Sequence, residues 1–126
     1  MNWERLKTDL RRLSYAYAVA VDDDYKSIIV KDFNLPPGYN RGQIPVMLKI
    51  PSRYPEDAPG IGQARVYVPD DLRYRGKKPE DFHDTSGPDG WAWWCYEWIN
   101  WNPCKDNLIT FFEMLRAHMT NPKTRS

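Results

Sequence analysis

The chain has 126 residues, of which 41% are hydrophobic and 28% are charged, and this balance predicts one domain with a single core. Its eighteen basic and seventeen acidic side chains nearly cancel, which argues against nucleic acid or an anionic membrane as a partner. No segment reaches the roughly 20 apolar residues of a membrane helix, and the charges from Glu4 onward do not suit a signal peptide. We therefore expect residues 1–126 to form a single domain in the reducing cytoplasm.

An amphipathic helix is predicted at the start of the chain, in residues 2–14. Apolar side chains recur there at spacings of three, four and three, and charged residues fill most positions between them. The predicted buried face consists of Trp3, Leu6, Leu10 and Leu13.

Four strands are predicted to follow this helix. Residues 15–22 alternate in period two, residues 27–33 are rich in β-branched side chains, and residues 43–51 and 64–69 are predominantly apolar. The connections contain turn residues and no helical pattern, so the four strands are expected to form an antiparallel meander with one face free to receive a helix.

The pattern changes after Pro69. Residues 70–90 are polar and lack periodicity, which predicts a long loop of the kind that is usually functional. The stretch GWAWWCYEWINWNPC, from Gly90 to Cys104, then holds five of the six tryptophans and both cysteines. Residues 105–119 show helical spacing, with Asp106 as the expected cap. The predicted fold class is α+β: an N-terminal helix, a four-stranded antiparallel meander sheet, a long cysteine-bearing loop and a C-terminal helix.

This order resembles the ubiquitin-conjugating enzyme superfamily, especially its small prokaryotic branches, over residues 1–122. Residues 35–61, LPPGYNRGQIPVMLKIPSRYPEDAPGI, look like the second and third strands of that family, with its Tyr-Pro at Tyr54 and Pro55. WNP, ending at Pro103, looks like the Trp-x-Pro that follows the catalytic cysteine, and HMTNP looks like the end of the family's helix. The resemblance to such relatives also suggests a role in defence against phage, although no residue of this chain points to that role by itself.

The resemblance implies that Cys95, six residues before Trp101, is the nucleophile and that Cys104 is a structural thiol. The family's His-Pro-Asn is not present. His83 is the only histidine in that region, and Asp84, Asp89 and Asn100 are stand-ins that the sequence does not rank. We assign supporting roles to His83 and Asp84, and we assign Asn100 the role of oxyanion donor or backbone organiser.

The implied reaction is thioester transfer: the cysteine takes a ubiquitin-like protein from an activating enzyme and passes it to an amine, without metal or cofactor. The activating enzyme is expected on the first helix and the ubiquitin-like protein near Cys95. Tryptophan is common at binding hot spots, although core and loop anchoring is its simpler role here. The candidate partner contacts are Lys7, Arg11, Arg12, Trp94 and Trp98.

Several alternatives remain open from the residues alone. A buried, inert Cys95 would make the protein a non-catalytic binding or adaptor module of the same fold. A zinc site would draw on His83, Cys95, Cys104 and His118, but their spacings match no short ligand pair, and His118 is more simply a polar-face residue. A cysteine hydrolase with His83 as base lacks a nucleophile elbow and a glycine-rich oxyanion loop.

Overall fold

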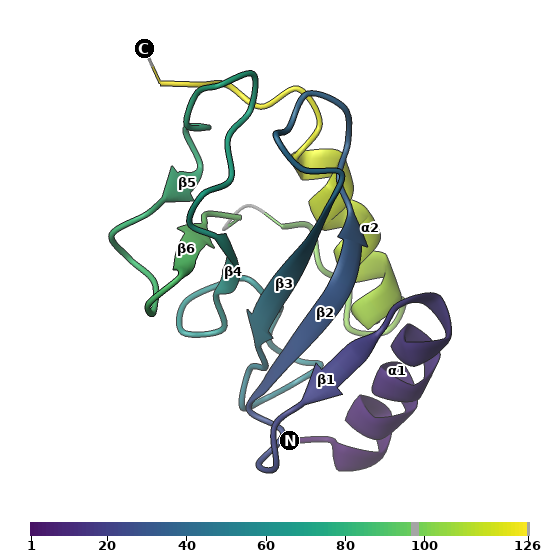
Figure 1. Cartoon of the computed structure of the whole chain (residues 1–126). Helices are drawn as coiled ribbons and strands as arrows, with labels where there is room; N and C mark the ends of the chain where they lie inside the picture. The colour runs from purple at the N-terminus through teal and green to yellow at the C-terminus, as the bar shows by residue number, and fades with distance from the viewer. Residues whose placement is uncertain (97–98, 126) are drawn as a thin grey trace.

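The computed structural model describes residues 1–96 and 99–125, which form an α+β fold with an antiparallel sheet (Figure 1). The strand order is β1-β2-β3-β4-β6-β5. The first helix, the four-strand meander and the last helix are as predicted, but the sheet is larger. The elements in the described residues are α1 (Trp3–Ala16), β1 (Val19–Val21), β2 (Ser27–Asn34), β3 (Gln43–Lys49), β4 (Val66–Pro69), β5 (Phe82–His83), β6 (Trp91–Trp94) and α2 (Leu108–His118).

Strands β5 and β6 lie where the sequence predicted loop. Strand β6 pairs with β4 over four residues, from Val66 opposite Trp94 to Pro69 opposite Trp91, and β5 closes the edge of the sheet. Strand β6 alternates between half-buried and buried positions. Its sequence, WAWW, is apolar throughout and therefore hides the period of two. The prediction of an irregular loop was wrong for these residues.

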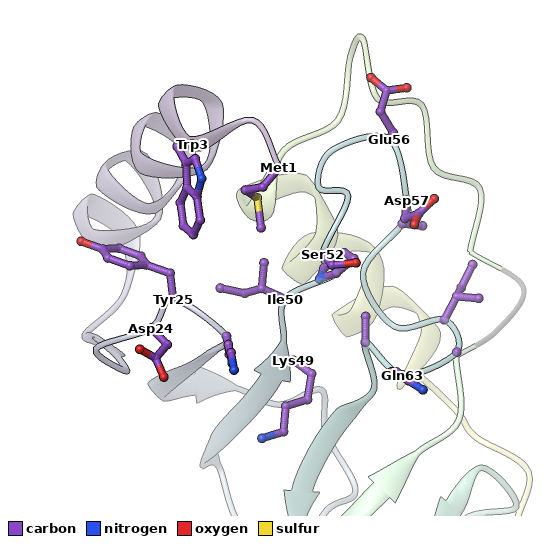
Figure 2. Close-up of a pocket in the computed structure, with 16 residues that line it drawn as sticks. Met1, Trp3, Asp24, Tyr25, Lys49, Ile50, Ser52, Glu56, Asp57 and Gln63 are labelled. Carbon is purple, nitrogen blue, oxygen red and sulfur yellow. The ribbon is translucent and has the colours of Figure 1, made fainter.

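Helix α1 buries three of its four predicted core residues, Leu6, Leu10 and Leu13. Trp3 is 47% exposed, so the prediction that it belongs to the buried face was wrong. As the first helical residue it packs edge-on against Tyr25 at 5.9 Å between ring centroids, and it lines a surface pocket of about 880 Å³ (Figure 2). The helix also continues to Ala16, into residues that were predicted to be strand, and β1 begins only at Val19.

Helix α2 is capped by Asn107 rather than by Asp106. The Asn107 side chain accepts a hydrogen bond from the Thr110 amide, and the Thr110 hydroxyl accepts one from the Asn107 amide, which together form a capping box. The Asp106 carboxylate instead accepts a hydrogen bond from the amide of Asn102 at 2.7 Å. The cap therefore lies one residue later than predicted.

Both helices share one core with the inward face of the sheet. The helices contribute Leu6, Leu10, Phe111 and Leu115, among others, and the strands contribute Ile28, Val30, Phe33, Val46 and Val66, among others. On the other face, the register aligns a row across five strands: Ile29, Met47, Tyr67, Trp93 and His83. The Arg65 guanidinium covers Trp93 in this row, at 3.9 Å from the ring centroid. Among the described residues, no helix has the length and apolar character needed to cross a bilayer.

Candidate functional site around Cys95

Cys95 directly follows strand β6 and is half-buried. Its backbone N–H donates a hydrogen bond of 2.8 Å to the carbonyl oxygen of Asp81. Because Phe82 pairs with Trp94 and His83 with Trp93, this bond extends the β5–β6 ladder by one residue and sets Asp81 opposite Cys95. The cysteine backbone is therefore held at the end of a strand pair.

The two residues that flank Cys95 in the chain both contact His118 of helix α2. The indole Nε1 of Trp94 donates a hydrogen bond of 3.0 Å to His118 Nδ1. The Tyr96 ring stacks on the imidazole, with centroids 4.2 Å apart and planes inclined by 27°. The site that the sequence assigned to a loop is thus attached to the last turn of α2.

His118 also pairs with Asp81, since its Nε2 lies 3.6 Å from Asp81 Oδ2. The Trp94 indole can only donate, so Nδ1 must be the unprotonated nitrogen and Nε2 carries the proton. Burial lowers the pKa of His118, and the Asp81 carboxylate opposes this shift in part. The Trp94 hydrogen bond and burial therefore both favour the neutral imidazole.

The assignment of His118 to a polar face was wrong. The ring is half-buried, and its contacts are with Trp94, Tyr96 and Asp81. The sequence does indicate that His118 lies on the buried face of the helix, because Phe111, Leu115 and His118 follow each other at spacings of four and three. Asp81 and Tyr96 carried no comparable local pattern, and only the β5–β6 pairing brings them to His118.

The three predicted supporting residues lie in different surroundings. His83 is on β5 opposite Trp93, and its ring packs on that indole at 4.9 Å. Asp84 accepts a hydrogen bond of 2.5 Å from Lys78, and this bond lowers the pKa of its carboxyl group. Asn100 is exposed. The register therefore places Asp81, rather than His83, across from Cys95.

The predicted contacts on α1 are all exposed: Lys7, Arg11 and Arg12. The Lys7 ammonium lies 5.8 Å from the centroid of the Tyr25 ring. Arg12 lies on another side of the helix, where it lines a polar pocket of about 470 Å³ together with Cys104. All three cations are accessible to a partner.

The prediction that Trp94 faces a partner does not hold. Its side chain is 0% exposed, because the indole fills the core beneath β6 and bonds to His118. Trp98, the other predicted tryptophan contact, lies outside the described residues.

Cys104 is an exposed thiol, in contrast to the expected structural role. Its amide donates to the Asn102 side chain at 3.0 Å, and its pocket also includes Arg5 and Lys105. Within residues 1–96 and 99–125, no group of three or more histidine, cysteine or acidic side chains is arranged to hold a metal ion.

The two helices and the antiparallel sheet are consistent with an E2-like fold, the class that the resemblance to ubiquitin-conjugating enzymes predicted. Residues 4–121 match the family described as Prokaryotic E2 family E, and the chain belongs to that family. Membership relates the protein to ubiquitin-like conjugation. Searches of curated proteins and of solved structures found no significant match.

Proposed function

We propose that the protein is a conjugating enzyme that carries a ubiquitin-like protein as a thioester on Cys95 and passes it to an amine. The observation that carries the proposal is the position of Cys95 within an E2-family chain. It directly follows β6, six residues before Trp101, and its backbone N–H bonds the carbonyl oxygen of Asp81. Half-burial leaves part of the residue exposed.

The proposed reaction consists of two acyl transfers. The Cys95 thiolate attacks the thioester carbonyl on the activating enzyme, a new carbon–sulfur bond forms, and the thiolate of the activating enzyme leaves. An amine then attacks the Cys95 thioester, a carbon–nitrogen bond forms, the amine proton passes to a base, and the Cys95 thiolate is released. Both steps develop a negative oxygen, and the exposed amide of Asn100 is the proposed donor to it.

His83 and Asp84 keep supporting roles in this proposal, through the β5 edge. His83 packs on Trp93, and Asp84 bonds Lys78. We propose that both contacts help to hold the segment that contains Asp81 next to Cys95. We do not assign either side chain a proton-transfer role.

The proposed partners are an activating enzyme and a ubiquitin-like protein. The exposed cations Lys7, Arg11 and Arg12 of α1 suit an acidic surface on the activating enzyme, with charge complementarity acting mainly on the rate of encounter. The ubiquitin-like protein would bind near Cys95, and the buried Trp94 is excluded from that contact.

The test is a non-reducing gel with intact mass measurement. The protein is mixed with a candidate activating enzyme, a ubiquitin-like protein and ATP, with and without a thiol reductant. We expect a reductant-sensitive adduct in the wild type and in Cys104→Ala, and none in Cys95→Ala. Because Cys104 is the more exposed thiol, an adduct that persists in Cys95→Ala would overturn the assignment.

The second candidate function is a non-catalytic module that binds a ubiquitin-like protein. The half-burial of Cys95, between two residues that pack on His118, favours it. Binding measured by calorimetry, without an adduct in the gel, would support this function over the first.

A further inference from the structure

His118 contacts three described residues next to Cys95: Trp94, Tyr96 and Asp81. Trp94 precedes the cysteine and bonds the ring, Tyr96 follows it and stacks on the ring, and Asp81 faces the ring with its side chain while its carbonyl holds the Cys95 amide. Three independent contacts thus link one imidazole to the main chain on both sides of the cysteine and across from it.

We propose that neutral His118 is the positioning residue for Cys95: it clamps the main chain around the cysteine, and protonation of its ring releases the clamp. The inference rests on the proposed function insofar as Cys95 is the reacting residue. His118 acts through its neighbours. Its Nδ1 accepts from Trp94 and its Nε2 faces Asp81, so neither nitrogen is offered to a substrate as a base.

The Trp94 bond makes the clamp depend on the protonation state. A protonated ring would direct an N–H at the N–H of the indole, and the 3.0 Å hydrogen bond would be lost in a buried location. Protonation would strengthen the pairing with Asp81, which acts in the opposite sense. Burial nevertheless lowers the pKa of His118 by more than the Asp81 carboxylate raises it.

Among the described residues, the phenols of Tyr96 and Tyr39 also lie near the ring and do not change charge at acidic pH. Tyr96, which follows β6, has its pKa raised by burial. Tyr39, from the connection between β2 and β3, bonds the carbonyl of Met119 at 2.6 Å, and burial raises its pKa too. Both phenols stay neutral below pH 7, and within residues 1–96 and 99–125 the carboxylate paired with the ring is that of Asp81.

Two substitutions of His118 test the role of its bond to Trp94, because one keeps this bond and the other removes it. Asn at this position keeps an acceptor oxygen near the place of Nδ1 and does not titrate, so His118→Asn should keep the Trp94 bond at every pH while it loses the Asp81 pairing and the stacking on Tyr96. His118→Leu fills space but loses both polar contacts. Glu113→Gln, on an exposed position of the same helix, is the matched control.

The first measurement is the rate of N-ethylmaleimide labelling at Cys95 relative to Cys104, from pH 5 to 8, by peptide mass. The ratio cancels most of the common dependence on thiolate fraction, and Cys104 is an exposed thiol that serves as the internal reference. We expect the ratio to rise by about threefold or more below pH 6.5 in the wild type and in Glu113→Gln, because local opening exposes Cys95. It should stay flat in His118→Asn and be high at every pH in His118→Leu.

A wild-type ratio with the same pH profile as His118→Asn would overturn the proposal. Melting temperature and circular dichroism establish that each variant is folded. If His118→Leu is unfolded, the comparison of the wild type with His118→Asn decides alone.

The second measurement is the rate of thioester formation in the gel assay. We expect His118→Leu to lose about tenfold or more and His118→Asn to stay within about threefold of the wild type, since small misplacements of a reacting group cost large rate factors. The two proposals fail separately. If the wild type forms no adduct, the proposed enzyme function is wrong, but the labelling test remains valid. If His118→Leu forms the adduct at the wild-type rate, only the positioning role of His118 is wrong.

Discussion

The Tyr54 hydroxyl donates a hydrogen bond of 2.5 Å to Oδ2 of Asp9, a carboxylate on α1 that is 1% exposed. Arg5 Nε donates to the same oxygen at 2.9 Å. The guanidinium of Arg5 also donates to the main-chain carbonyls of Pro103 and Asp106. One buried network therefore joins α1, the connector between β3 and β4, and the segment that leads into α2.

Replacing Tyr54 with Phe should lower the free energy of unfolding by about 2 kcal/mol, because the buried carboxylate loses a hydrogen-bond donor while the ring is kept. Urea unfolding followed by fluorescence would measure the change. Tyr15→Phe, at a position that is 84% exposed, serves as the control and should have no effect. A loss below about 0.5 kcal/mol in Tyr54→Phe would mean that the network adds little stability.

Asn107→Ala should cost about 1 kcal/mol, since the Thr110 amide loses its capping acceptor at the start of α2. Asn107→Asp keeps the acceptor and adds a negative charge at the helix N-terminus, so its stability should match or exceed the wild type. Thermal unfolding of both variants would test the cap. Equal losses in the two would contradict it.

Gly87→Ala should destabilise the turn before β6. A Cβ at this position would lie 2.4 Å from the carbonyl oxygen of Trp91, which is backbone and cannot rotate away. Gly42 has nothing within 4 Å of the same built atom, so Gly42→Ala should be neutral or stabilise by up to about 1 kcal/mol. The midpoints of urea unfolding for the two variants should therefore move apart.

In the native protein, Cys104 should react with a small alkylating reagent faster than Cys95 at pH 7.5. The former is exposed and the latter is half-buried, and access limits the rate of a thiol. Timed quenching followed by peptide mass would give both rates. Reaction of Cys95 only after denaturation would contradict its role as a nucleophile.

Stability should fall as the pH is lowered through about 6.5, in part because of His118. Its pKa is lower in the folded protein than the ordinary value of 6.5, so the unfolded chain binds more protons in this range. The contribution of His118 is complete above pH 6.5 and decreases as the pH falls toward the folded pKa. Urea midpoints at pH 7.5 and 5.5 should differ less in His118→Asn than in the wild type, whereas equal differences would argue against the shift.

Local patterns in the sequence predicted the helices and strands that can be recognised from their own apolar spacing, without knowledge of the segments that pack against them. Leu6, Leu10 and Leu13 mark α1, and residues 108–119 mark α2, because a helix buries one stripe at a period of 3.6. The meander followed from alternation and short connections. Trp3 deviates because its ring, at the start of α1, packs edge-on against Tyr25 and lines a surface pocket instead of entering the core.

The position of Cys95 before Trp101 could be recognised in the sequence, but its surroundings could not. Strand β6 is apolar at all four positions, and β5 has only two residues, so neither showed a period. Their pairing with β4 and with each other places Asp81 opposite Cys95, and the packing of α2 then supplies His118. The sequence by itself determined both helices and the strands β1 to β4, because these depend on local pattern, and the family resemblance pointed to the candidate thiol. The tertiary structure alone decided which side chains surround that thiol, because they come from segments that meet only when the sheet closes on α2.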